Sequence, residues 1–284
     1  MFAGWVIHNE RGNMKNWSTV ILAAAIAATV GSTSFAEGAP LKVLLLTGGC
    51  CHDYKAQKDI LKKGLEERLN IEITLIHTDD KSTKPPLPIY GNPDYAKGYD
   101  LVIHDECSAD ITDPAVIAGV LKPHKDGIPG VNLHCAMHCY RFGNYQKPVA
   151  AGADNAGWYE YTGLQTTGHG SQLPIAIHFV DADSAITKGM ADWTTVNEEL
   201  YNNIQLMPNL HALAKGKQIS KNKEGKETTT DNVVAWVNTY GEKKTRVFST
   251  TIGHNNSTVD DPRYLDLVAN GIVWALNRTD VRKK

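Results

Sequence analysis

Apolar runs of strand length recur along the chain, and turn-forming residues separate them. The first run covers residues 41–47 and stops at Gly48-Gly49, after which residues 54–69 place apolar side chains on one face of a helix. Residues 71–77 alternate apolar and polar side chains and predict a second strand. A continuous apolar strand followed by an amphipathic helix and a further strand is typical of the first unit of a parallel sheet.

Later segments extend this pattern. Asp113 and Pro114 open a helix that runs to about His124, with Asp113 as its cap and Pro114 in its first turn. A last helix is predicted over residues 262–276, which are apolar on one face. Further strands are expected at residues 101–104, 130–134, 174–180, 233–237 and 246–251. Alternation at 174–180 is typical of an antiparallel strand, and a hairpin-length connection containing Gly241 joins the last two strands.

Three segments lack this regularity. Residues 78–94 are rich in proline, glycine and lysine, and a loop of that length acts as a lid or binding element or is a mobile insertion. Residues 151–170 are irregular and dense in glycine and aromatic residues, and the lysine-rich segment 215–226 is predicted to be an exposed loop. The remaining elements predict an α/β fold with a mainly parallel sheet, helices on both faces and an antiparallel extension.

The N-terminus has the layout of a secretory signal peptide. Lys15 precedes an alanine-rich apolar run at residues 20–30, and Ser34-Phe35-Ala36 follows as a small-residue cleavage site. We expect translation from Met14, cleavage after Ala36 and one mature periplasmic or secreted domain over residues 37–284. Residues 1–13 do not fit this layout, and their translation would weaken the case for export. The apolar run is far shorter than the ~20 residues that cross a bilayer, so no membrane anchor is expected in the mature protein.

The composition narrows the class of partner. The chain has 284 residues, of which 42% are hydrophobic and 21% charged, as in an ordinary globular protein. Its 29 lysine and arginine residues face 31 aspartate and glutamate residues. No basic excess is available to neutralise phosphates, so a nucleic acid is not expected as a partner. The expected partner is a small, uncharged or mildly polar molecule.

Five stretches bring a histidine to the end of a predicted strand. They lie at residues 48–53, 104–107, 134–139, 168–170 and 253–254. The carboxyl ends of neighbouring strands in an open α/β sheet line one crevice, so residues distant in sequence can meet there. The sequence therefore predicts a polar catalytic or binding pocket at this edge.

The five cysteines are an odd number, so at least one is unpaired in an exported protein. Cys50 and Cys51 are adjacent and hard to bridge with each other, and Cys135 and Cys139 are one helical turn apart, a spacing that rarely allows a good disulfide. A bridge between different strand ends remains open. So does the alternative that all five are small buried hydrophobic residues near the sheet edge.

Several short motifs are spread over residues 42–277. They lie at residues 49–54, 133–134, 186–190, 198–201, 234–237, 246–254 and 271–275. In this order the motifs resemble those of the trehalose-utilization (ThuA-like) family. The resemblance implies a flavodoxin-like α/β domain related to class I glutamine amidotransferases, and a link to carbohydrate metabolism.

The chemistry of a glutamine amidotransferase is not expected. That reaction needs a cysteine on a tight Gly-x-Cys-x-Gly elbow and a His-x-Glu partner, because the thiolate must be exposed, activated and oriented. Here Leu133 and Met137 occupy the glycine positions around Cys135, and Asn255-Asn256 follow His254.

The resemblance also implies the catalytic residues. The family holds a histidine at the elbow, which corresponds to His134, although Asn132 replaces the preceding glycine and leaves the turn geometry open. Glu199 and His254 fall on other polar positions of the family. We expect His134 and His254 to exchange protons and Glu199 to orient one of them, since histidine titrates near neutral pH and a carboxylate raises its pKa. Such a set could move protons at a ring hydroxyl, or at a carbon next to a carbonyl, in a sugar or keto-sugar derivative.

Five residues are predicted to bind the substrate: His52, Asp53, Trp158, His169 and Tyr201. His52 and His169 also fall on polar positions of the family, and would bind substrate hydroxyls or stabilise developing negative charge. Trp158, with Tyr159 and Tyr161 nearby, could stack on a pyranose face. These aromatic residues could equally pack as the core of the irregular segment.

Two alternatives to an acid–base enzyme remain open. Imidazoles together with carboxylates or thiolates also bind transition metals, so a metal-dependent hydrolase would use His52, His134, His169 and His254 as ligands. However, the sequence contains no Cys-x-x-Cys or His-Glu-x-x-His, and no cofactor is predicted. A nicotinamide cofactor is not expected, because Gly-x-Gly-x-x-Gly is absent after the first strand. The other alternative is a non-catalytic carbohydrate-binding or scaffold protein, which the same fold would support.

Overall fold

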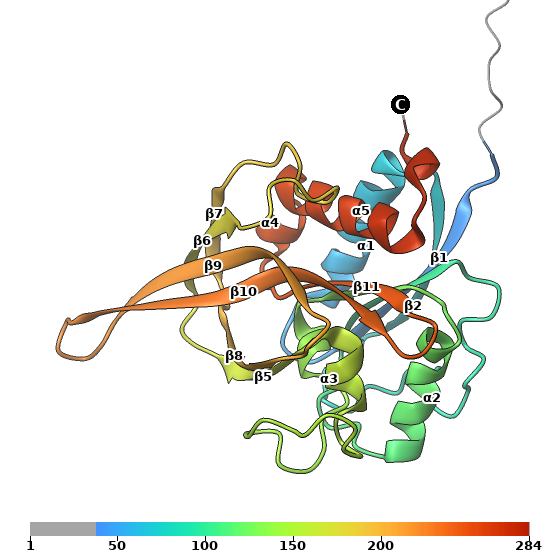
Figure 1. Ribbon diagram of the computed structural model, residues 1–284, viewed down its shortest axis with the longest axis horizontal. Coiled ribbons are helices and arrows are strands. Elements are labelled where there is room, and N and C mark those ends of the chain that lie inside the picture. Colours follow the sequence, from blue (N-terminus) through green and yellow to red (C-terminus); the bar gives the residue numbers. More distant parts are fainter. Residues whose placement is uncertain (1–37, 284) are drawn as a thin grey trace, which may run out of the picture. The chain divides into compact units, whose positions relative to one another are not determined.

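The computed structural model describes residues 38–283, and the predicted signal peptide lies outside them. A nine-stranded sheet runs in the order β2-β1-β3-β4-β11-β10-β9-β6-β7 (Figure 1). Its parallel half contains β1 (Leu41–Gly49), β2 (Ile71–Thr78), β3 (Leu101–Cys107), β4 (Gly130–Leu133) and β11 (Thr245–Thr250). Counted along the chain, these strands lie in the order 2-1-3-4-5 of flavodoxin-like folds.

An antiparallel extension continues the sheet beyond β11. It contains β10 (Glu227–Tyr240), β9 (His211–Lys221), β6 (Leu173–Phe179) and β7 (Trp193–Glu198). A separate two-stranded sheet pairs β5 (Leu164–His169) with β8 (Tyr201–Leu206). The predicted α/β class with an antiparallel extension is confirmed.

Helices cover both faces of the parallel half, as predicted (Figure 1). On one face lie α1 (Tyr54–Arg68), α4 (Asn256–Val259) and α5 (Pro262–Leu276), with the short η2 (Thr279–Val281) after α5. On the other lie α2 (Pro114–Lys125) and α3 (Gly157–Thr162), and η1 (His134–His138) directly follows β4. Among residues 38–283, no helix has the length and apolar character needed to cross a membrane.

Alternate side chains of the buried strands pack into two hydrophobic cores, one on each face of the sheet. In β1, Val43 and Leu45 pack toward α1 and α5, whereas Leu44 and Leu46 pack toward α2. The α5 helix approaches β11 closely at Gly271, where an added Cβ would lie 2.4 Å from the Phe248 ring. This close approach explains why a glycine is accommodated in the middle of a helix.

The sequence signals for helix starts are confirmed. Asp113 accepts a hydrogen bond from the Ala115 backbone nitrogen at 2.8 Å, and Pro114 occupies the first turn of α2. Asp261 caps α5 in the same way through the Arg263 nitrogen at 2.9 Å.

The prediction of an exposed loop over residues 215–226 is wrong. Most of this segment belongs to the β9–β10 hairpin, in which only residues 222–226 connect the strands. The inward positions are Gly216 and Gln218, while Lys215 and Lys217 point outward. Gly216 is required there, because a Cβ would lie 2.6 Å from Val234. An alternation of lysine with glycine and glutamine carries no apolar signal, so the strand could not be recognised by hydrophobicity.

The loop at residues 78–94 is packed against the protein. Leu87 and Ile89 are buried in the core beside α2, and the Tyr90 hydroxyl lies 2.7 Å from Ser108 Oγ. The irregular segment 151–170 contains α3 and β5, two elements that the sequence pattern did not reveal.

Candidate functional site

His134 stands at a sharp turn where β4 ends and η1 begins. Its φ is 40°, in the left-handed region that few non-glycine residues adopt. Such a turn between a strand and a helix presents a side chain above the carboxyl edge of the sheet. Nδ1 donates a hydrogen bond to the Thr251 carbonyl oxygen at 2.6 Å, so Nδ1 carries a proton and Nε2 faces the site.

Glu199 lies among three imidazoles, in the turn between β7 and β8. Its Oε2 is 3.4 Å from His134 Nε2, and its Oε1 is 3.2 Å from His254 Nδ1 and 3.4 Å from His169 Nε2. Gln172 Nε2 donates to Oε1 at 3.1 Å and lies 2.9 Å from His254 Nε2. Burial alone would raise the pKa of Glu199, but the hydrogen bonds with His134 and His254 hold it well below its usual value. Glu199 is therefore a carboxylate at neutral pH.

The loop that carries His254 is fixed by two buried residues. Glu198 accepts hydrogen bonds from the backbone nitrogens of His254 and Asn255, both at 2.9 Å. Gln57 on α1 donates to the carbonyl oxygens of Gly253 at 3.2 Å and His254 at 3.0 Å. The position of His254 is thus set from both sides of the loop.

His52 and His254 have pKa values shifted in opposite directions. Burial, with the neighbouring imidazoles of His134 and His254, lowers the pKa of His52 from 6.5 to about 2. The hydrogen bond with Glu199 raises the pKa of His254. The two rings are 4.8 Å apart between centroids. A neutral and a readily protonated imidazole therefore lie side by side, the arrangement that separates base from acid.

These two histidines line one cavity of about 870 Å³. One wall is the turn after β1, another is the start of the loop after β2, and the third is the loop before α4. The lining polar side chains include Asp53, Lys55, Asp79, Asp80, Lys81, Asn255 and Asn256. His134 and Glu199 lie behind the cavity wall, and each is at most 5% exposed. The site thus has an accessible layer and a buried layer.

The sequence of this chain matches the family model described as ThuA, trehalose utilisation, over residues 42–275. The chain belongs to the ThuA family. A ThuA-like protein from Parabacteroides merdae is 18% identical, with a TM-score of 0.61 over 86% of this chain and 92% of that one. Another from Bacteroides uniformis is 14% identical, with a TM-score of 0.54 over 84% and 92%. No curated protein matches the chain in sequence.

ThuA membership confirms the predicted family and fold and supports a role related to carbohydrate metabolism. A glutamine amidotransferase from Thermotoga maritima is also among the matched solved structures, at 10% identity and a TM-score of 0.40 over 83% of this chain and 98% of that one. In this ThuA chain the elbow carries His134, and Asn132 two residues earlier donates to Ser249 Oγ on β11 at 3.0 Å. The departure at Asn132 is therefore compatible with the turn.

The ThuA site uses Asp53 and Tyr201 as supports. Asp53 caps α1 through the Ala56 nitrogen at 3.3 Å and accepts from Asn256 Nδ2 at 2.8 Å, while still lining the cavity. Tyr201 is buried, with its hydroxyl 3.2 Å from His134 Nε2. Its ring stacks on His138 with centroids 4.1 Å apart. Tyr201 can therefore orient His134, but it lies outside the cavity.

The predicted stacking role of Trp158 is not compatible with its position. The side chain is 1% exposed, packs edge-on against Tyr140, and donates from Nε1 to the Ala136 carbonyl oxygen at 2.9 Å. Tyr159 and Tyr161 are also buried. The packing alternative holds for all three aromatic residues, because the irregular segment folds into α3 against the sheet.

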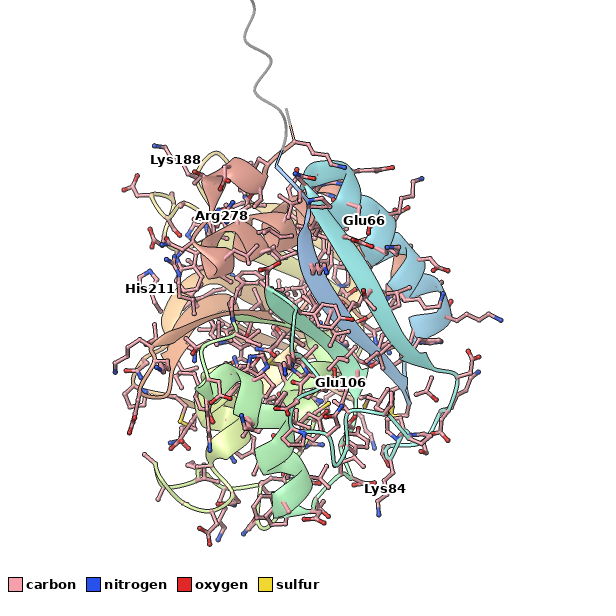
Figure 2. The ribbon with its side chains drawn as sticks, turned by 90° about the vertical axis from the view of Figure 1, so that its right-hand side faces the viewer. Glu66, Lys84, Glu106, Lys188, His211 and Arg278 are labelled. Carbon is pink, nitrogen blue, oxygen red and sulfur yellow. A yellow bond between two sulfur atoms is a disulfide. The ribbon has the colours of Figure 1, made fainter. Side chains whose placement is uncertain are left out.

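His104 does not join the other histidines. It lies inside β3, fully buried on the face of α2, with Nδ1 2.9 Å from Glu106 Oε1 and Nε2 3.1 Å from His124 Nε2. Tyr140 donates to the same Glu106 oxygen at 2.7 Å. Figure 2 shows Glu106 inside the molecule, whereas Lys84 and Lys188 lie at the surface. Four of the five histidine stretches therefore meet at the site, and the fifth forms a polar network in the core.

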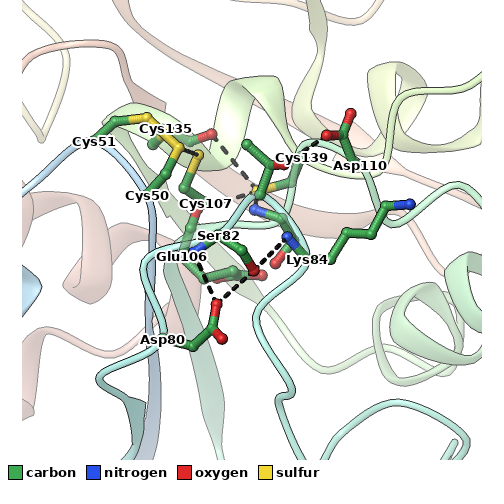
Figure 3. Close-up of a disulfide and its surroundings, with 12 residues drawn as sticks. Cys50, Cys51, Asp80, Ser82, Lys84, Glu106, Cys107, Asp110, Cys135 and Cys139 are labelled. Carbon is green, nitrogen blue, oxygen red and sulfur yellow. Dashed lines mark hydrogen bonds between the residues drawn. A yellow bond between two sulfur atoms is a disulfide. The ribbon is translucent and has the colours of Figure 1, made fainter.

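Cys50 and Cys51 form a disulfide, contrary to the expectation that adjacent cysteines are hard to bridge (Figure 3). The turn after β1 has an unusual backbone, with a φ of 83° at Cys51 after two glycines that also have positive φ. Cys107, Cys135 and Cys139 are free and buried, so the alternative that all five cysteines are buried hydrophobic residues holds for these three and is wrong for Cys50 and Cys51. Cys139 donates to the Glu106 carbonyl oxygen at 3.1 Å.

The residues that sequence reasoning missed surround the histidines. Gln172, Glu198, Gln57 and His77 hold or line the site, but none was predicted to do so. Glu198 belongs to the family motif at residues 198–201 and directly precedes Glu199, which was the predicted site residue of that motif. Gln172 follows the predicted Gly-His-Gly stretch by two positions, so proximity to a known motif was the available signal.

Proposed function

We propose that this ThuA protein is an exported enzyme that acts on a sugar or keto-sugar derivative by acid–base chemistry. The observation that carries the proposal is the opposite pKa shift of His52 and His254 on the wall of one cavity. An imidazole kept neutral can donate a hydrogen bond to a substrate oxygen, while a neighbouring imidazole whose pKa is raised by a carboxylate accepts a proton at the same pH.

The chemistry follows from these two states. His254, whose pKa is raised by Glu199, accepts a proton from the carbon next to a substrate carbonyl, and the neutral imidazole of His52 donates a hydrogen bond to the carbonyl oxygen as electrons move onto it. Glu199 stabilises the charged form of His254, and His134 holds Glu199 from the other side at 3.4 Å. The initial assignment of proton exchange to His134 and His254 is refined here, because His134 lies behind the cavity wall.

The cavity suits a small carbohydrate. Its volume of about 870 Å³ lies in the range of small-molecule sites, and carboxylates, amides and ammonium groups on its walls can pair with hydroxyl groups. We therefore propose a mono- or disaccharide ligand, with no role for nucleic acid. A non-catalytic sugar-binding protein would depend on stacking by aromatic residues such as Trp158 and Tyr161, and both of these are buried.

The direct test is proton exchange at carbon. The purified protein is incubated with a panel of keto-sugars in deuterated buffer, and deuterium at the carbon next to the carbonyl is followed by NMR. We expect enzyme-dependent incorporation that falls ~10²–10⁴-fold in His52→Gln and His254→Gln. His178→Gln is the matched control, because His178 pairs with Asp192 and its side chain is 69% exposed. Full exchange in the two site variants would refute the assignment.

A metal-dependent hydrolase is a second candidate, favoured by a specific observation. His52, His134, Glu199 and His254 each offer one ligand atom within 4.8 Å of the others. The Glu199 oxygens lie 3.2–3.4 Å from the imidazole nitrogens. Ligand atoms bound to one tetrahedral zinc at ~2.0–2.1 Å are separated by roughly 3.3–3.4 Å, whereas charge-assisted hydrogen bonds are nearer ~2.8 Å. This set differs from the predicted ligands at one position, because it contains Glu199 where the prediction had His169.

Elemental analysis separates these two functions. Stoichiometric zinc or another divalent metal that is lost in His134→Ala, with activity removed by a chelator and restored by one ion, would favour the hydrolase. Chelator-resistant exchange of deuterium would favour acid–base chemistry.

We propose a periplasmic or secreted location, supported by the signal-like N-terminus and by the Cys50–Cys51 disulfide, since disulfides persist in oxidising compartments. The proposal predicts that mature protein from the native host begins at Glu37. N-terminal sequencing tests this, and a retained Met1 or Met14 would contradict cleavage.

A further inference from the structure

Three sulfur atoms, those of Cys50, Cys51 and Cys107, lie within 4.8 Å of one another beside the cavity. In Figure 3 they follow one another as Cys51, Cys50 and Cys107. Cys50 Sγ is bonded to Cys51 and lies 3.4 Å from Cys107 Sγ. The fold brings these residues together, because Gly49 and Cys107 are register partners at the ends of the parallel strands β1 and β3. Neighbouring strands are ~4.8 Å apart, within the range of Cα separations that a disulfide spans.

We propose that these residues form a thiol–disulfide exchange site, in which Cys107 attacks Cys50 and the disulfide passes from Cys50–Cys51 to Cys50–Cys107. The Cys107 sulfur forms a bond to the Cys50 sulfur, and the bond between Cys50 and Cys51 breaks. The electron pair leaves with Cys51, which takes up the proton that Cys107 has lost. The number of disulfides is unchanged, so the step needs no external oxidant or reductant.

Cys107 has the surroundings of an attacking thiol. A hydrogen bond with Cys135 and one with the Ala109 backbone, together with the positive charge of Arg141, lower the pKa of Cys107 despite its burial. The thiolate is the nucleophilic form of cysteine. The hydrogen bond with Cys107 and burial raise the pKa of Cys135, and burial together with the charge of Glu106 raises the pKa of Cys139, so these two are poor competitors.

The exchange moves a free thiol from the core to the cavity. Cys107 is 3% exposed, whereas Cys51 is exposed and lines the cavity next to His52. The φ of 83° at Cys51 is rare for a non-glycine residue, so opening the ring of the adjacent disulfide frees this backbone to change. In the exchanged form, Cys51 is the sulfur that a small electrophile or a low-molecular-weight disulfide can modify.

Trapping the released thiol tests the exchange. Mature protein purified without reductant is incubated in its native state with N-ethylmaleimide, and peptides are mapped by mass spectrometry without reduction. We expect alkylated Cys51 and a Cys50–Cys107 linked peptide to accumulate together at the same rate. In Cys107→Ser, alkylation of Cys51 should fall at least tenfold, because no nucleophile remains.

Cys139→Ser is the matched control. It removes an equally buried thiol, and the serine hydroxyl can keep the hydrogen bonds to Glu106 and Ser108. This variant should label like the unmodified sequence. Equal labelling of Cys51 with and without Cys107, or an unmodified Cys51 after prolonged incubation, would overturn the proposal.

A second variant keeps the test valid if Cys107→Ser does not fold. In Cys51→Ser, Cys50 and Cys107 are the neighbouring thiols at 3.4 Å. Mild oxidation should link them quantitatively in peptide maps. Failure to link them under conditions that oxidise Cys50 to other products would show that the two sulfurs cannot react.

Discussion

Oε1 of Glu199 lies 3.2 Å from Nδ1 of His254, and this contact raises the pKa of the imidazole. Glu199→Gln removes the negative charge and nearly preserves the shape. We expect the pKa of His254 to fall, and deuterium exchange into keto-sugars to drop ~10²–10⁴-fold. NMR titration of His254 in metal-free protein measures the first quantity, and the exchange assay measures the second.

Asp192→Asn provides the comparison for this prediction. Asp192 pairs with His178 at 2.5 Å, but both side chains are more than half exposed. Neither the His254 titration nor exchange should change in this variant. An unaltered His254 titration in Glu199→Gln would show that the carboxylate does not control this imidazole.

The burial of His52 makes the free energy of unfolding depend on pH. Its pKa is about 2 in the folded protein against 6.5 as the ordinary value, so below pH 6.5 the unfolded chain binds a proton that the folded protein does not. Stability from this group is present above pH 6.5 and is lost as the pH falls toward 2. From His52 alone we expect a free energy of unfolding ~2 kcal/mol lower at pH 5 than at pH 7.

Urea denaturation of chelator-treated protein at the two pH values measures this difference. His52→Gln should be less sensitive to acid by about the same amount. His254 acts in the opposite direction: its pKa is raised, so its contribution is present below its unfolded pKa and lost as the pH rises through the folded pKa. Undiminished acid sensitivity in His52→Gln would rule out a neutral, buried His52.

Glu198 is predicted to be essential for the shape of the site. It is fully buried, and its carboxylate accepts from the backbone nitrogens of His254 and Asn255. In Glu198→Ala each nitrogen left without an acceptor destabilises the fold by ~1–3 kcal/mol, and His254 loses its position. We expect a lower melting temperature together with loss of exchange activity. Glu67→Ala is the control, because that side chain is 60% exposed, and normal activity in Glu198→Ala would contradict a positioning role.

Two glycines in helices should respond oppositely to alanine. At Gly271 the new Cβ would lie 2.4 Å from the Phe248 ring, whereas at Gly119 in α2 nothing lies within 4 Å. Gly271→Ala is expected to destabilise by ~1–3 kcal/mol through overpacking, and Gly119→Ala to stabilise by roughly 0.5–1 kcal/mol through helix propensity. Chemical denaturation of both variants gives the comparison. Equal effects at the two positions would contradict the tight contact between α5 and β11.

The parallel half of the sheet was predictable because its strands are nearly continuous apolar runs between turn residues. The β9–β10 hairpin was missed for the reason seen at Gly216 and Gln218, which are buried without being hydrophobic. The strand β3 was predicted to end at residue 104 but continues to Cys107, for a similar reason. His104 and Glu106 satisfy each other inside the strand, so their polarity was mistaken for the strand's end.

The convergence of His52, His134, His169 and His254 could be predicted, since it depends on where strands end and on family motifs. The sequence could not predict that His52 and His254 line the cavity while His134 lies behind its wall. That arrangement depends on the loops between 198 and 201 and between 253 and 255. The Cys50–Cys51 disulfide could not be predicted from the sequence either. It requires a positive φ at Cys51, which residue spacing does not reveal.

The carboxylate at the centre of the site comes from the turn between β7 and β8, whereas the imidazoles around it come mainly from the ends of β1, β4 and β11. Contacts between segments so distant in sequence give the site a high contact order, and they form late in folding. A partly refolded chain can therefore have native-like helices and a parallel sheet while the charge balance around Glu199 is still missing. Recovery of the proposed proton exchange is therefore expected to lag behind recovery of secondary structure, so this exchange would be a stricter measure of complete refolding than helix or sheet content.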